Sequence, residues 1–404
     1  MIKDYFFLAL RNLKKRKLRS FLTLIGIIAS ISTIFVLIGL SLGLQGAVEE
    51  QFRTLGSDKL FIFPATGFLG PPGSVGGTIL AEKDIETIKK VKGVEDYSYF
   101  VISNAEVKFG DEIKYLAVIG VPTENMDVFT EGGAWSAEEG INLEKGDSGK
   151  LMVGSLFGEG KVFSSSLERG NKLKINNEKF EIKAIAKPIG NPADDSSILI
   201  PLEDLRRVFK ISERVDQIVV KVDEGENIFE VAERIENKLI KTRGVTKKTK
   251  DFVISTPDEL LESFGNVLDI ITVFLIGIAS ISLFVGGVGI ANTMYTSVIE
   301  RTKEIGIMKA VGARNSEIVK LFLIESGLLG LVGGIVGVIF GILIGNGIEY
   351  IAINNLNTNL LAVETPLILI FGSLIFAFVI GGISGLIPSW GASKTNIVDA
   401  LRYE

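Results

Sequence analysis

Residues 270–299 read IITVFLIGIASISLFVGGVGIANTMYTSVI and contain no Asp, Glu, Lys or Arg. Three further stretches share this property, namely residues 20–48, 326–348 and 365–393. A transmembrane helix needs about 20 predominantly apolar residues to cross the hydrocarbon core of a bilayer. All four stretches are long enough. The sequence therefore predicts an α-helical membrane protein with four transmembrane helices.

The region between the first two stretches has the composition of a soluble domain. Short β-like runs, for example 179–186 and 197–200, are separated there by Gly, Pro and Asn turns. A pattern of helix, Gly-Val and strand occurs twice, around residues 93–94 and 244–245. We therefore expect an α+β extracytoplasmic domain inserted between spans 1 and 2, with two related halves that flank a β-rich insertion.

The expected boundaries follow from these patterns. The chain begins with a cytoplasmic interfacial helix (1–19) and transmembrane helix 1 (20–45), followed by the extracytoplasmic domain (46–266) and a membrane domain (267–404). The two halves of the extracytoplasmic domain are expected at 46–122 and 206–266, with the insertion at 123–205. The membrane domain is expected to hold spans at 268–296, 324–348 and 365–390, with a connecting loop at 297–320.

The distribution of basic residues predicts the orientation. Basic residues are concentrated at 14–19, before the first span, and again in the loop 297–320, whereas the short loop between spans three and four holds Glu349 and Glu364 and no Lys or Arg. Cytoplasmic loops of membrane proteins carry an excess of Lys and Arg. We therefore expect a multi-pass protein of the cell membrane with both termini in the cytoplasm.

Glycines in register predict helix packing in the spans. In the third span, Gly333, Gly337, Gly341 and Gly345 recur every four residues and so share one helix face. Small residues on such a face let another helix approach closely in lipid. The same spacing occurs at Gly39 and Gly43 in span one and at Gly381 and Gly385 in span four. The sequence leaves open whether the partner is another span or a second copy of the chain.

Composition excludes several functions. The chain contains no His and no Cys, which removes the commonest general base, the thiolate metal ligand and the disulfide. An enzyme is therefore disfavoured, and we expect no catalytic residue, metal or cofactor in this chain. The net charge of −5 and the lack of a basic face give no indication of nucleic-acid binding. Asp194 and Asp195 could bind a cation, but the adjacent pair after Pro192 is more typical of a solvated turn.

Glu325 is an ionisable residue at the inner edge of the third span. Such residues are functional candidates by default. Its position is close enough to the cytoplasm to reach water or Lys320, so both a structural interface role and a coupling role remain open.

Three segments together resemble one family. They are ALRNL at 9–13, ERTKEIGIMKAVGA at 300–313, and GLIPSWGA at 385–392 with ALRYE at 400–404. These segments, with their order and spacing, resemble the permease subunits of MacB/FtsX/LolC-type ABC transporters, the mechanotransmission class. Met308 and Ile397 depart from the usual residues of that family.

The resemblance implies a mechanism. It implies a MacB-like core domain with porter-like halves outside the membrane and an FtsX-like membrane domain. It also implies a permease that works with a second copy of itself or a related permease, each bound by a separate cytoplasmic ATPase that holds ATP and Mg. The residues that would couple to the ATPase are Glu300, Arg301, Lys303, Glu304, Ile305, Gly306, Ile307, Lys309, Val311, Gly312 and Arg314.

The resemblance leaves two functions open. The first is export or extraction of a substrate, with lipid and an extracytoplasmic adaptor as further partners. The alternative is a transmembrane regulator or sensor that transmits ATPase-driven motion to an extracellular enzyme without net transport.

Overall fold

The computed structural model describes residues 17–397 and 400, apart from residues 57, 66–78, 132 and 359. The side chains of residues 17–23 and 52–55 are not described. Most of the expected interfacial helix 1–19 therefore lies outside the described residues, as do the last four residues of the chain.

The chain divides into two compact units, each treated by itself below. The helical unit comprises residues 1–45, 266–352 and 361–404, and the α+β unit comprises residues 46–265 and 353–360. The connection after the third long helix thus belongs to the α+β unit, where the Thr358 hydroxyl donates to the Gly190 carbonyl at 3.3 Å.

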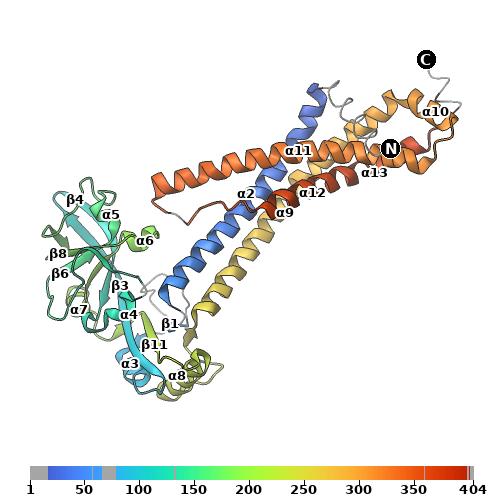
Figure 1. Cartoon of the computed structure of the whole chain (residues 1–404). Coiled ribbons are helices and arrows are strands. Elements are labelled where there is room, and N and C mark those ends of the chain that lie inside the picture. The colour runs from blue at the N-terminus through green and yellow to red at the C-terminus, as the bar shows by residue number, and fades with distance from the viewer. Residues whose placement is uncertain are drawn as a thin grey trace. The chain divides into compact units, whose positions relative to one another are not determined.

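Six helices account for most of the helical unit (Figure 1). They are α2 (Lys17–Leu55), α9 (Pro257–Glu300), α10 (Thr302–Ala310), α11 (Asn315–Ile351), α12 (Leu367–Ser384) and α13 (Leu386–Ser393), with a π-helical turn η2 (Ala352–Leu356) after α11. Four helices in the described part of the chain are long and apolar enough to cross a membrane: 24–51 within α2, α9, 315–356 and α12. Helices α2 and α9 each continue without interruption from one unit into the other.

The fourth apolar stretch is shorter as a single helix than the expected span 365–390. It divides at Gly385 into α12 and α13. Pro388 in the first turn of α13 has no N–H and cannot continue the hydrogen bonds of a preceding helix, which accounts for the break at this position.

The glycine row on α11 receives side chains of α2. A β-carbon added at Gly333 would lie 2.9 Å from Ile27 Cγ2, and one added at Gly337 would lie 3.0 Å from Ile31 Cβ. One turn further, a β-carbon at Gly341 would lie 2.8 Å from Phe35 Cδ1. The described structure therefore places the partner of this row within the same chain.

The remaining glycines pack against other segments of the helical unit. An added β-carbon at Gly381 would lie 2.9 Å from Gly330 Cα, so α11 and α12 are in backbone contact, and Gly385 lies against Ser326. Gly39, Gly43 and Gly345 all face residues 362–364, an extended segment rather than a helix. The Glu364 N–H donates to the Gly39 carbonyl at 3.0 Å.

We expect Gly337→Leu to destabilise the helical unit by about 1–3 kcal/mol because the added side chain meets Ile31 and the Ile28 carbonyl. The matched control is Gly347→Leu, since Gly347 lies on the same helix with nothing within 4 Å of an added β-carbon. Thermal unfolding of the full chain in detergent measures both. Equal melting temperatures for the two variants would contradict the packing described here.

The α+β unit is built on a mixed sheet in which one long strand changes partner. Residues 94–100 of β3 (Val94–Phe109) pair antiparallel with β11 (Gln217–Val222), and residues 101–109 pair with β4 (Glu112–Val121). The full strand order is β12-β1-β11-β3-β4-β9-β6-β8-β5, with β7 beside β3 and β8. The other strands of the unit are β1 (Lys59–Pro64), β2 (Leu80–Ala81), β5 (Ala137–Gly140), β6 (Lys150–Val153), β7 (Lys172–Ile175), β8 (Glu178–Ala186), β9 (Ile198–Pro201), β10 (Arg214–Val215) and β12 (Phe252–Ser255).

Two helices cover the sheet beside β1, β11 and β12. They are α3 (Glu82–Ile88) and α8 (Ile228–Arg243), and each is followed by a glycine with positive φ and then a strand. Arg243, at the end of α8, binds Asp84 of α3 at 2.6 Å and Asp251 at 2.8 Å. The helix, Gly-Val and strand pattern of the sequence thus occurs twice. The boundaries of the two halves and the insertion stay a prediction.

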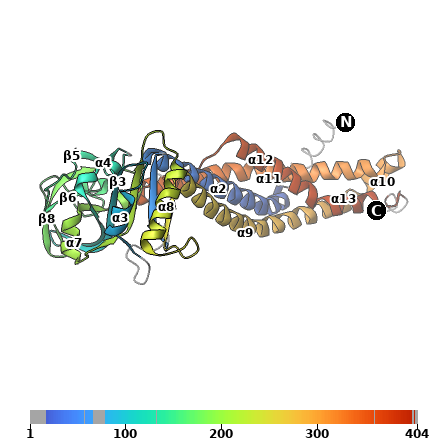
Figure 2. The same cartoon turned by 90° about the horizontal axis from the view of Figure 1, so that it is seen from below.

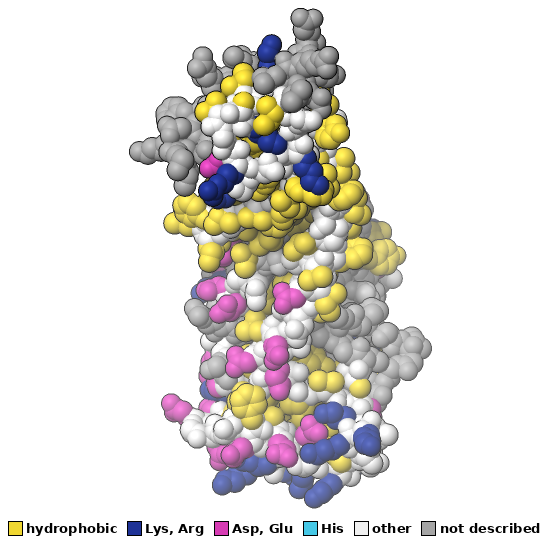
Figure 3. All heavy atoms as spheres, turned by 90° about the vertical axis from the view of Figure 1, so that its right-hand side faces the viewer, with side chains coloured by type: hydrophobic (Ala, Val, Ile, Leu, Met, Phe, Trp, Pro, Cys, Tyr) yellow, Lys and Arg dark blue, Asp and Glu magenta, His cyan; other side chains and the backbone are white. Residues whose placement is uncertain are grey.

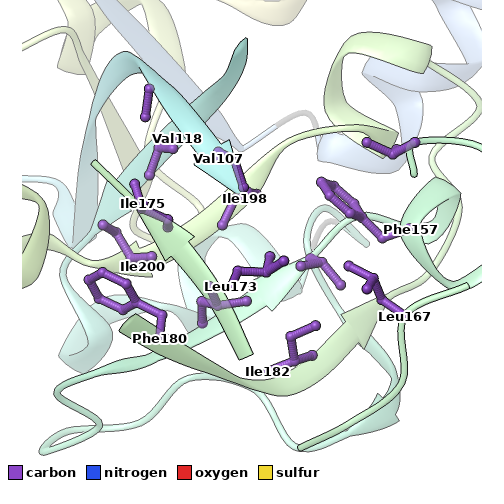
Figure 4. Close-up of a cluster of buried hydrophobic side chains, with 14 of the residues drawn as sticks. Val107, Val118, Phe157, Leu167, Leu173, Ile175, Phe180, Ile182, Ile198 and Ile200 are labelled. Atoms are coloured by element: carbon purple, nitrogen blue, oxygen red, sulfur yellow. The ribbon is translucent and has the colours of Figure 1, made fainter. Parts of the chain in front are cut away.

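The remaining short helices belong to the β-rich part of the unit (Figure 2). They are η1 (Thr123–Asn125), α4 (Asp127–Thr130), α5 (Ser155–Gly158), α6 (Pro192–Asp195) and α7 (Leu202–Phe209). The strands there enclose an apolar cluster in which Phe157, Leu173 and Phe180 are almost completely buried (Figure 4). This core is independent of the one under α3 and α8.

The interpretation of Asp194 and Asp195 as a solvated turn is wrong. They end α6, and Asp195 is only 3% exposed. Its carboxylate accepts the N–H groups of Ile189 and Gly190 at 2.8 and 2.9 Å. The two donors are backbone N–H groups just before α6, and residue identity gives no indication of them.

A buried carboxylate makes the α+β unit sensitive to acid. Asp147 accepts the Glu144 N–H and the ammonium groups of Lys150 and Lys183. Burial alone would raise the pKa of Asp147, but the two lysines and the backbone donor outweigh it and lower the pKa from 3.8 to about 2. A lowered folded-state pKa stabilises the fold above pH 3.8, and this contribution is lost as the pH falls through about 2.

We therefore expect Asp147→Asn to lower the melting temperature of the full chain at pH 6, with a difference from the wild type that shrinks as the pH approaches 2. Thermal unfolding followed through a pH series measures this. A difference that stays constant with pH would show that the carboxylate charge is not the cause.

Candidate functional site

The segment between α9 and α11 forms a compact turn around the short helix α10. Helix α9 ends at Glu300, and Arg301 leaves the helical conformation before α10 begins. After α10, Gly312 has a φ of +105°, a left-handed conformation that suits a glycine at a helix end. The Arg314 N–H then donates to the Glu317 side chain at 2.9 Å, which satisfies a free donor at the start of α11.

A buried ion pair fastens this turn to α11. The Arg301 guanidinium donates from Nη1 to Glu325 Oε2 at 2.9 Å and from Nε to Glu304 Oε2 at 2.8 Å. The side chains of Arg301 and Glu325 are 12% and 8% exposed, and the guanidinium lies 5.4 Å from the centre of the Phe322 ring. The ion pair therefore joins the start of α10 to the third turn of α11. Glu325 thus binds Arg301, a partner that the sequence analysis did not name.

Lys309 fastens the other end of α10 to the end of α13. Its ammonium donates to the carbonyls of Ser393 and Thr395 at 2.8 and 2.9 Å. The last carbonyls of a helix have no partner within the helix, and a cation there is favourable. Lys309 thus closes α13 and holds α10 beside it.

The contacts divide α10 into an inner and an outer face. Ile305 is completely buried in a core with Ile318 and Phe322, and Gly306 is buried as well. The outer face carries Ile307, 51% exposed, and Val311, 85% exposed. Lys303, Glu304, Gly312 and Arg314 are also exposed.

This geometry changes which residues a partner could contact. The resemblance implies that Arg301, Ile305 and Lys309 couple to an ATPase, and this stays a prediction. In the structure all three side chains are directed into the helical unit. Glu300 is exposed at the end of α9, and the charged and apolar residues of the outer face remain available. The sequence could not separate the two faces, because basic and apolar residues occur on both.

Phe322 and the carbonyls of Ser393 and Thr395 were missed by the sequence reasoning. Phe322 is one turn of α11 before Glu325, and this spacing places both side chains on the same helix face. That spacing was readable in the sequence. The carbonyls of Ser393 and Thr395 could not be identified from the sequence, because every residue carries a backbone carbonyl.

The described residues provide no group of three or more His, Cys, Asp or Glu that could hold a metal ion. The turn instead presents exposed charged and apolar side chains on a rigidly held short helix, which is an arrangement for contact with another protein.

Removing one member of the buried ion pair should destabilise the helical unit strongly. We expect Arg301→Met to cost about 3–5 kcal/mol, because it takes the guanidinium away from the buried Glu325 carboxylate. Glu325→Met should cost less, because Arg301 keeps its bond to Glu304, and the double variant should be closer to the wild type than Arg301→Met alone. Glu304→Met is the matched control, since it removes only the exposed arm and should cost less than about 1 kcal/mol. Thermal unfolding in detergent tests this, and additive losses in the double variant would contradict it.

The class of protein follows from these observations together with the comparisons. Long apolar helices and an α+β unit formed by residues 46–265 and 353–360 are the features expected of a membrane permease subunit. The family model described as MacB-like periplasmic core domain matches residues 20–238, and the model described as FtsX-like permease C-terminal matches residues 276–397.

The chain belongs to the MacB-type family of ABC transporter permeases. It is 36% identical to an uncharacterized ABC transporter permease of Methanocaldococcus jannaschii, over 100% of this chain and 98% of that protein. It is 27% identical to the uncharacterized permease YknZ of Bacillus subtilis, over 98% of both chains.

Proteins with an ATP-binding part are also among the relatives. The macrolide export ATP-binding/permease protein MacB of Marinobacter nauticus is 28% identical over 98% of this chain and 60% of its own length. The chain thus spans about three fifths of the MacB protein that it matches.

Proposed function

We propose that this chain is the permease subunit of an ABC transporter in which a separate cytoplasmic ATPase, holding ATP and Mg, drives motion of the α+β unit for export or extraction of a substrate. The proposal rests on the outer face of α10, where Lys303, Ile307 and Val311 are exposed. The opposite face is held by the contacts of Arg301 with α11 and of Lys309 with the end of α13.

The fastening supports a mechanical role for α10. Arg301 ties its start to α11 and Lys309 ties its end to α13. A displacement of the outer face by a partner is then transmitted to α11 and α13 through these contacts. Side chains that keep their contacts in a packed core move together, because such cores do not deform continuously.

The membrane topology follows the distribution of charge. In the proposed topology, four spans with α10 and both termini in the cytoplasm leave the α+β unit outside the membrane, and the excess of Lys and Arg at 14–19 and 297–320 supports it. Helices α2 and α9 run unbroken from the helical unit into the α+β unit. The connection after α11 also enters the α+β unit, so three chain segments could carry motion across.

The exposed apolar side chains of α9 support the proposal that lipid or a partner protein covers this helix. It exposes large apolar side chains along its length, among them Ile270, Phe274 and Phe284 at 68–73% exposure. Hydrophobic side chains also cover much of the helical surface in Figure 3. We propose that lipid and a second permease subunit cover this surface, as the resemblance to dimeric permeases implies. An extracytoplasmic adaptor is a further proposed partner.

The alternative proposal is regulation without transport. The same motion could activate an extracellular enzyme, or an outside binding event could be sensed inside. Net movement of a substrate with substrate-stimulated ATP hydrolysis supports transport. ATPase-dependent activation of a partner without net movement supports the alternative.

The test is formation of a complex between this chain and the ABC ATPase encoded beside its gene. We expect two permeases and two ATPases to co-elute in detergent, and Lys303→Glu combined with Val311→Asp to abolish the complex, because both residues lie on the outer face of α10. Glu304→Lys alone should weaken the complex, because Glu304 is also exposed on α10.

The matched control is Lys320→Glu, an exposed charge reversal on α11 that should leave the complex intact. A complex that survives the α10 substitutions would remove α10 as the docking helix. Failure of every candidate ATPase to bind would favour the sensor.

A further inference from the structure

A cavity of about 380 Å³ lies within the α+β unit, apart from the α10 turn. This volume corresponds to about twelve water molecules at liquid density. It also lies in the range of small-molecule sites, which are typically apolar with a few polar groups.

The floor of the cavity is one face of the sheet. Phe61 of β1 pairs in register with Val219 of β11, and Gln217 of β11 pairs with Phe100 of β3, and all four residues line the cavity. Lys59 lies two residues before Phe61 on the same face of β1 and lines the cavity as well.

Aromatic rings form one wall. The rings of Phe100, Phe129 and Trp135 contact one another, with centroid separations of 6.0 Å (Phe100–Phe129), 5.6 Å (Phe100–Trp135) and 5.2 Å (Phe129–Trp135). Trp135 has a φ of +51°, which is unusual for a bulky residue and costs of order 1–3 kcal/mol. The fold thus maintains a strained conformation that brings the indole into this wall.

The charged residues that line the cavity are Glu50, Lys59 and Asp194. Glu50 is exposed, and Asp194 accepts a hydrogen bond from Asn191 at 2.9 Å. Burial and the neighbouring Asp195 raise the pKa of Asp194, so it takes up a proton more readily than an ordinary carboxylate.

Lys59 is the least exposed of the three charged residues. The residue is 3% exposed, and no hydrogen bond or ion pair reaches its ammonium from the residues that the structure describes. The nearby Glu131 is bound at 3.0 Å by Lys221 instead. Burial lowers the pKa of Lys59, against the opposing influence of Asp58 and Glu131.

A buried ammonium without a partner is unfavourable unless an opposite charge compensates it. We propose that the cavity binds a small anionic amphiphile, an aliphatic or aromatic carboxylate whose anion pairs with Lys59 and whose apolar body lies against Phe61, Phe100 and Trp135. This site goes beyond the proposed coupling function and does not depend on it.

An organic cation is the competing ligand chemistry. Aromatic rings and carboxylates attract cations, and Glu50 and Asp194 would favour one. Lys59 is nevertheless the least exposed charged residue of the cavity, and its ammonium repels a cation at close range, whereas the raised pKa of Asp194 weakens its attraction for a cation, so the anion is favoured.

The experiment uses the full chain in nanodiscs of neutral phosphatidylcholine. The chain has two Trp residues, and in a Trp390→Phe background Trp135 alone reports on the cavity through its fluorescence. The probes are octanoate, octylammonium and octanol, which share one tail and differ in the head group. Empty nanodiscs correct for partition of each probe into lipid.

We expect octanoate to change the Trp135 emission saturably and more tightly than octylammonium or octanol. Lys59→Met should weaken octanoate binding by about tenfold or more, because it keeps the apolar stem and removes the charge. Lys59→Arg is the matched control and should retain binding. Unchanged emission of ligand-free Lys59→Met shows that the site is still folded.

Three results would overturn the proposal: octylammonium binding as tightly as octanoate, octanoate binding unchanged in Lys59→Met, or no saturable response to octanoate. If Lys59→Met does not fold, Ala134→Phe provides the second test. Ala134 lines the cavity, so a ring there should fill it and abolish octanoate binding with Lys59 in place. Retained binding in Ala134→Phe would equally overturn the site.

Discussion

Backbone contact between helices is the constraint on which the helical unit depends. In lipid, apolar side chains gain nothing by leaving the hydrocarbon, so close packing has to hold the helices together. Helix α11 meets this condition on two faces, with Gly333, Gly337 and Gly341 under α2 and Gly330 against Gly381 of α12. With α11 held on both sides, the turn that precedes it has a rigid base.

That base explains why a charged pair can exist at the inner end of α11. Arg301 and Glu325 are both removed from water, which is favourable only when the geometry is good and further hydrogen bonds are made. Glu304 and the ring of Phe322 supply the additional contacts to Arg301. The same residue that looks like an external contact in the sequence therefore acts as an internal brace, and the outer face of α10 is what remains for a partner.

In the α+β unit, a single long strand, β3, pairs with both β11 and β4. Strand β3 changes partner near Phe100, which lets one strand take part in two portions of the sheet, and Phe100 lines the cavity. The loop that lines this cavity with Ile189 also receives the Thr358 hydroxyl at Gly190. The wall of the cavity is therefore in contact with the segment that follows α11.

Much of this protein was determined by the sequence alone. Charge-free length predicts the apolar helices, and the four-residue glycine spacing predicts a packing face, because both depend only on local composition and helical period. Tertiary structure decided the direction of Arg301, Ile305 and Lys309 and the surroundings of the Lys59 ammonium. Each depends on groups distant in the chain, many of them backbone atoms that every residue carries, so no local pattern could have shown them.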